Sequence, residues 1–130
     1  MLRSKSLIDK TTELAVFELL KSRAEARIYI FLLKKNGALS EEIIKGTKLH
    51  PSTVRELLSK MYNKKMITRT KIKNDSIGKN PYFYQPIPPR RLLQRRIKEL
   101  EQRLNKIYRI DRCAEKSAYV QIQIITNKVE

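Results

Sequence analysis

The chain has 130 residues, and its 29 Lys and Arg against 13 Asp and Glu give a net charge of +16. This length suits one domain, or a small domain with an extension. A single cysteine, Cys113, excludes an intrachain disulfide, and together with the single histidine, His50, it is too few ligands for a structural zinc site. No apolar run approaches the ~18 residues of a membrane span, and no secretory signal is visible. We therefore expect a cytoplasmic protein with no metal or other cofactor and no membrane partner.

The positive charge predicts an anionic partner. Hydrophobic residues make up 41% of the chain, too many for a disordered polycation, so a folded domain must carry the charge. An anionic membrane surface would favour one strongly basic amphipathic helix. The cations are instead spread along the whole chain, which favours nucleic acid.

Two helices are predicted in the first third of the chain. Residues 9–20 carry apolar side chains at the spacing of a mostly buried helix. The second helix starts after Ser22, where Ser22 and Glu25 have the spacing of a capping box that satisfies exposed amides reciprocally. Its end is predicted at Asn36 and Gly37, which favour a left-handed cap.

The next segment predicts two short helices and a hairpin. A third helix is expected from a cap at Ser40 to about Gly46, and a fourth from Pro51 to about Asn63. Residues 66–72 and 82–84 are β-prone and flank a turn-rich stretch. A helix pair at turn spacing, preceded by a helix and followed by a hairpin, is the order of a winged helix-turn-helix.

Three prolines, Pro86, Pro88 and Pro89, mark a boundary, so we predict one domain over residues 1–88 and a second segment over residues 89–130. A helix from Arg90 to Lys116 is expected there. Its apolar residues have the alternating spacing of four and three of a coiled-coil seam, which continues weakly through Asp111: Leu93, Ile97, Leu100, Leu104 and Ile107. The seam packs either on the chain's own first helix or on a second copy. Because little of the domain is left to cover it, we predict a homodimer. Beyond Ser117, alternating residues predict a short strand or an irregular tail.

The predicted fold class is therefore mainly α: a winged helix-turn-helix with a small β-hairpin wing, followed by a long C-terminal coiled-coil dimerisation helix. In such folds the second helix of the pair enters the major groove. The residues opposite or beside its apolar stripe are the candidate DNA contacts: Ser52, Thr53, Arg55, Glu56, Ser59 and Lys60. Arg55 is the one side chain among them able to read guanine bidentately. The alternative is an ordinary solvated helix face.

The predicted wing is strongly basic, with seven cations against one acid between residues 60 and 80. Its candidate contacts to phosphates or to the adjacent minor groove are Arg69, Lys71, Lys73, Asn74, Lys79 and Asn80. The alternative is solubilising charge on an edge hairpin. The dimerisation segment adds ten cations against four acids between residues 90 and 116.

No catalytic pattern is present, and we expect no enzyme. His50, next to the fourth helix, is interpreted as a cap or a phosphate contact, and Cys113 as a packed thiol. The three glycines, at positions 37, 46 and 78, cannot form a phosphate-binding loop.

Three blocks of sequence resemble the N-terminal DNA-binding domain of the TrmB family of archaeal-type transcriptional regulators. They are Glu25-Ala26-Arg27-Ile28-Tyr29, the helix-turn-helix over residues 40–61, and the run from Pro81 to Pro89. The resemblance implies that Pro51, Ser52, Thr53 and Arg55 recognise DNA. Two departures stand out: Lys48 occupies a turn position where such families usually carry Gly, and no large effector domain follows. No small-molecule effector is therefore expected.

The sequence thus predicts a homodimeric transcriptional regulator that binds double-stranded DNA and is associated with the nucleoid. Three alternatives remain open: a sequence-tolerant architectural DNA-binding protein, a winged-helix interaction subunit of the basal transcription machinery, and an RNA-binding protein.

Overall fold

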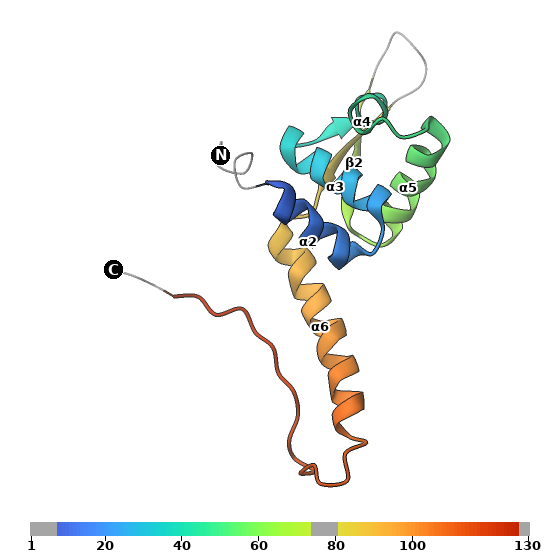
Figure 1. Cartoon of the computed structure of the whole chain (residues 1–130). Coiled ribbons are helices and arrows are strands. Elements are labelled where there is room, and N and C mark those ends of the chain that lie inside the picture. Colours follow the sequence, from blue (N-terminus) through green and yellow to red (C-terminus); the bar gives the residue numbers. More distant parts are fainter. Residues whose placement is uncertain (1–7, 74–80, 128–130) are drawn as a thin grey trace. The chain divides into compact units, whose positions relative to one another are not determined.

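The computed structural model describes residues 8–73 and 81–127. The chain forms two compact units, Met1–Ile87 and Pro88–Glu130. The first contains α2 (Lys10–Leu20), α3 (Arg23–Lys35), β1 (Ala38–Leu39), α4 (Ser40–Thr47), α5 (Pro51–Asn63), β2 (Ile67–Lys71) and β3 (Tyr82–Pro86), and the second contains α6 (Pro89–Tyr108) (Figure 1). Helices with a small antiparallel sheet in this order make a winged helix, as predicted.

The sheet has three strands in the order β1-β3-β2. The predicted hairpin is formed by β2 and β3, in a register that places Arg69 opposite Tyr84 and Ile67 opposite Pro86. β1 was not predicted from the sequence, because two residues are too few to show an alternating pattern. β1 pairs with β3 at Ala38 and Leu39, so β3 is the central strand. Pro86 is the last residue of β3.

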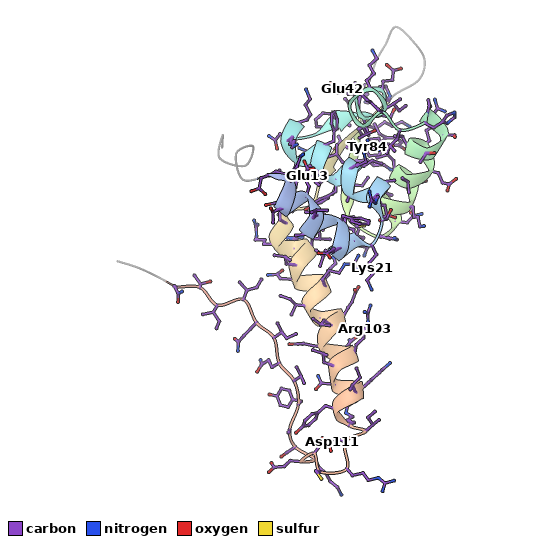
Figure 2. The ribbon with its side chains drawn as sticks, in the orientation of Figure 1. Glu13, Lys21, Glu42, Tyr84, Arg103 and Asp111 are labelled. Atoms are coloured by element: carbon purple, nitrogen blue, oxygen red, sulfur yellow. The ribbon has the colours of Figure 1, made fainter. Side chains whose placement is uncertain are left out.

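The core of the first unit lies where α3, α4 and α5 pack together (Figure 1). Its fully buried side chains come from all three helices and from β2; the largest are Tyr29, Ile28, Leu32, Ile43, Leu58, Met61, Ile67 and Val54. Tyr84 of the central strand is also buried there (Figure 2). Burying such side chains stabilises the fold by roughly 1.5–3 kcal/mol each relative to exposure.

Most helix ends lie where local residues predict them. Ser22 caps α3 and accepts a hydrogen bond from the Glu25 N–H at 3.2 Å, and Asn36 ends the helix in the left-handed region at φ 60°. The expected cap at Ser40 is wrong. Ser40 is already inside α4, and the Glu42 carboxylate accepts from the Leu39 N–H at 2.8 Å instead.

The turn between α4 and α5 takes the shape that glycine usually provides. Lys48 ends α4 with φ 59°, and its N–H donates to the Ile44 carbonyl at 3.0 Å. A side chain in this left-handed conformation costs about 1–2 kcal/mol. The helix-turn-helix therefore keeps its turn despite the missing glycine.

The second unit departs from the prediction. The expected long coiled-coil helix to Lys116 is not observed, since α6 ends at Tyr108 and a series of turns follows. Asp111 lies in these turns (Figure 2), where its carboxylate accepts from the Cys113 N–H at 2.9 Å. An aspartate that bonds the backbone two residues ahead competes with helix, and it stands where the apolar series already weakens. Residues 119–127 form neither helix nor strand, which is one of the two expected outcomes.

One buried hydrogen bond fixes the end of the first unit. The Tyr29 hydroxyl of α3 donates to the Ile87 carbonyl at 2.7 Å, and both residues are buried. This bond joins the central helix to the segment that follows β3, across 58 positions of sequence.

Replacing Tyr29 by Phe should destabilise the protein, because the Ile87 carbonyl loses its buried donor. We expect the free energy of unfolding in urea to fall by about 1–3 kcal/mol with an unchanged m-value. Burial raises the pKa of Tyr29 from 10.0 to about 12. The unfolded chain thus ionises this phenol first, and the stability that it contributes is lost as pH rises through that window. The difference in the free energy of unfolding between wild type and Y29F should therefore shrink as the pH rises from 10.0 to about 12. A difference that stays constant over this range would contradict the assignment.

Candidate nucleic-acid interface

The candidate interface is built on the two faces of α5. Val54, Leu58 and Met61 are buried on its inner face, and Leu57 is half-buried beside them. Successive residues of a helix are rotated by 100°, so the positions away from this buried stripe face outward. The predicted contact residues Ser52, Thr53, Arg55, Glu56, Ser59 and Lys60 are all exposed, and Pro51 is half-buried in the first turn.

The N-terminus of α5 is capped by His50. Its Nδ1 accepts from the Ser52 N–H at 3.2 Å and lies 2.8 Å from the Ser52 hydroxyl. Because a backbone N–H can only donate, this cap requires a free lone pair on Nδ1. His50 thus has the cap role that its position predicts, and Ser52 already has a local partner for its hydroxyl.

An ion pair holds the C-terminal end of α5 against α3. Lys64, the residue that ends α5, places its Nζ 3.3 Å from Oε2 of the buried Glu25. The spacing of Ser22 and Glu25 predicted a reciprocal capping box for this carboxylate. The structure gives it a partner 39 positions away instead. The Glu25 side chain is 4% exposed and that of Lys64 is 46% exposed. Losing the Lys64 ammonium would remove a partner from a buried carboxylate, so the contact restrains the end of α5.

The described part of the wing presents two of the predicted cations. Lys71 ends β2 and Lys73 follows it, and both are exposed. The hairpin extends past its strands through a hydrogen bond from the Ile72 N–H to the Pro81 carbonyl at 2.8 Å. Three predicted wing residues, Asn74, Lys79 and Asn80, lie outside the described residues.

Arg69 has a different environment from the other wing cations. Its guanidinium lies between two rings, 3.9 Å from the centroid of Tyr62 on α5 and 4.4 Å from that of Tyr82 on β3. Burial raises the pKa of Tyr84, the residue paired with Arg69 across the sheet, and the neighbouring Arg69 charge opposes this rise. We call Arg69, Tyr62 and Tyr82 the arginine clamp. It fastens the end of α5 to the hairpin.

The clamp was missed at the level of sequence, although one signal was available. Tyr82 and Tyr84 alternate on one face of a predicted strand, where a facing cation would meet their rings. The contribution of Tyr62 has no such signal, since it depends on how α5 packs against the sheet. Arg69 therefore acts first as a contact within the domain.

Residues 8–73 and 81–127 contain no group of three His, Cys, Asp or Glu side chains placed to hold a metal ion. Cys113 is exposed, which corrects the expectation of a packed thiol. Within the same residues, no helix is both long and apolar enough to cross a membrane.

Comparisons with known proteins agree with this architecture. The family described as "Sugar-specific transcriptional regulator TrmB" matches residues 14–90, more than half of the chain. A solved structure described as a possible transcriptional regulator from Methanosarcina mazei Go1 superposes with a TM-score of 0.61. The two chains are 20% identical, and the match covers 78% of this chain and 88% of the other. At that identity the likeness concerns the fold alone. No curated protein sequence matches the chain.

The arginine clamp makes a testable contribution to stability. Replacing Arg69 by Ala should lower the free energy of unfolding by about 1–2 kcal/mol, because two cation–π contacts are lost. Arg69→Lys should recover only part of this, since an ammonium lacks the planar face that stacks on both rings. Amide exchange in β2 and β3 should accelerate in the Ala variant.

Lys71→Ala is the matched control, because it removes an exposed cation from the same strand. This substitution should change the free energy of unfolding by no more than about 0.5 kcal/mol. Equal losses for the variants at positions 69 and 71 would show that the clamp adds no stability.

Proposed function

The chain belongs to the TrmB family of transcriptional regulators, and from this premise we propose that it binds double-stranded DNA with α5 in the major groove and the wing on the phosphate backbone. The observation that carries the proposal is the exposed polar face of α5, held in place by a buried stripe, the Glu25–Lys64 pair and the arginine clamp. A positioned helix loses little conformational entropy when it enters a groove.

In this proposal the exposed residues of α5 and those of the wing have different roles in DNA binding. Arg55 faces outward and has the fork geometry that matches a guanine edge, so we assign it the reading of one base pair. The small hydroxyl residues Thr53 and Ser59 suit phosphate or base contacts. Lys71 and Lys73 supply charge to the backbone, which adds affinity for any sequence. Arg69, held in the clamp, positions the wing.

We further propose that the protein acts as a homodimer through α6. Leu93, Leu100 and Ile107 recur every seven residues along this helix and are 44%, 44% and 62% exposed. The other two seam residues, Ile97 and Leu104, are half-buried. Exposed apolar side chains at heptad spacing are typical of a helix that packs against a second helix. Two copies would address two half-sites on one face of the duplex.

DNA footprinting and salt titration test the proposal directly. On the DNA upstream of its own gene, the protein should protect a site of roughly two-fold symmetry. If the dimer neutralises about six to ten phosphates, the plot of log affinity against log salt should have a slope of about −5 to −9. Uniform protection of all sequences would favour the architectural alternative, and a flat salt response would exclude groove binding.

Two substitutions test the division of labour. Arg55→Ala should cost about 1–3 kcal/mol at the cognate site and relax the preference at one base pair per half-site. Lys73→Ala should weaken binding to all sequences alike and make the salt slope shallower. Binding is measured by fluorescence anisotropy on the cognate duplex and on duplexes changed at one base pair.

Lys35→Ala is the control, because it removes one exposed positive charge from the end of α3, outside both predicted surfaces. It should affect affinity less than Lys73→Ala. Identical effects of the Arg55 and Lys73 variants on every duplex would overturn the assigned roles.

A further inference from the structure

Exposed apolar side chains concentrate in the second unit. Among the described residues, ten large hydrophobic side chains are exposed, and seven of these follow Pro88: Leu93, Leu100, Ile107, Ile110, Tyr119, Ile124 and Ile125. Three of them lie on the α6 seam, and three lie in the tail beyond residue 118. Exposed apolar side chains that gather in one segment of a chain favour an interaction surface. A second helix packed on the α6 seam would not explain why the apolar side chains of the tail are exposed.

Two side chains of α6 bind the tail, which runs as an open ribbon without helix or strand (Figure 1). The Asn105 side chain accepts from the Val120 N–H at 2.6 Å and donates to the Val120 carbonyl at 3.1 Å. Glu101 Oε2 accepts from the Ile122 N–H at 2.7 Å. These side chains bond the N–H and the carbonyl of Val120 and then the N–H of Ile122. A neighbouring strand would bond the same backbone groups. These contacts occupy one edge of the segment.

The other edge of the same segment is open. In an extended chain successive backbone groups point to opposite edges, so the groups of Gln121 and Gln123 lie on the side away from Asn105 and Glu101. Among the residues that the structure describes, neither glutamine has a hydrogen-bond partner. Tyr119 and Ile125, which flank them, are 68% and 75% exposed. The tail therefore presents a strand edge with apolar side chains around it.

The charge pattern indicates which partner this edge takes. Residues 117–127 contain no charged side chain, the longest such run in a chain that is 32% charged and has a net charge of +16. An acidic partner would be attracted to the cationic surfaces elsewhere, whereas a second copy approaches with least repulsion where charges are absent. In an antiparallel pair of identical strands, each copy also offers backbone donors and acceptors that match those of the other copy.

We propose that residues 119–125 of two copies pair as antiparallel strands and form part of the dimer interface, with Asn105 and Glu101 orienting each strand. The pairing rests on the proposed homodimer and extends it beyond the α6 seam. It also covers a β-prone, uncharged segment without Pro or Gly, which would otherwise be prone to aggregation.

The test uses the full chain with Gln121→Pro, which removes an N–H from the open edge and leaves the residues bonded to Asn105 and Glu101 in place. Sedimentation velocity should show that the dimer dissociation constant rises about tenfold or more. Gln121→Ala, which keeps the backbone N–H, should leave it near the wild-type value. In wild type, the amide of Gln121 should exchange more slowly as protein concentration increases.

The outcomes separate this inference from the proposed homodimer. A wild-type dimer whose dissociation constant is the same in the Q121P variant, with exchange at Gln121 independent of concentration, would overturn the strand pairing alone. A wild-type chain that stays monomeric at all concentrations would overturn the homodimer and the pairing with it. Circular dichroism of Q121P should match wild type, because the substitution lies outside the first unit.

Discussion

The arrangement of the candidate interface depends on the burial of Val54, Leu58 and Met61 along one side of α5. These side chains fill the core between α3 and α4, and a helix whose apolar stripe is fixed has no freedom to rotate about its axis. The outward direction of Arg55 and Ser59 follows from this constraint alone. No specific contact of their own is needed to orient them.

Burial fixes the rotation of α5 but leaves its tilt and its relation to the hairpin to polar contacts. The Glu25–Lys64 pair joins its C-terminal end to α3, and the arginine clamp joins the same end to the sheet. Both tethers act at the last turn, where helices otherwise fray. The clamp thereby links the end of α5 to β2 and β3 and fixes Arg69 relative to that helix. Such preorganisation lowers the entropic cost of binding an extended partner.

Sequence patterns predicted the features that depend on neighbouring residues. The caps at Ser22 and Asn36, the start at Pro51 and the stripe of α5 were all correct because caps and helical periodicity are local. Two of the failures share a cause, because they concern contacts between residues far apart in the sequence. The partner of Glu25 is 39 positions distant, and the rings around Arg69 come from two different elements, so neither contact has a local signature. α6 was predicted too long because a weak heptad was extended through Asp111, whose side chain favours a turn.

The charge of the chain links the two proposed activities thermodynamically. Two copies that each carry +16 repel one another when they associate, and that repulsion opposes any dimer held only by an apolar seam and an uncharged tail. DNA supplies negative charge along the wings and α5, so a bound duplex removes much of the repulsion. Whatever favours the dimer on DNA must equally favour DNA binding by the dimer. In the proposed pairing, the uncharged run at residues 117–127 confines self-association to a surface that adds no repulsion, and the cationic surfaces stay available for the duplex.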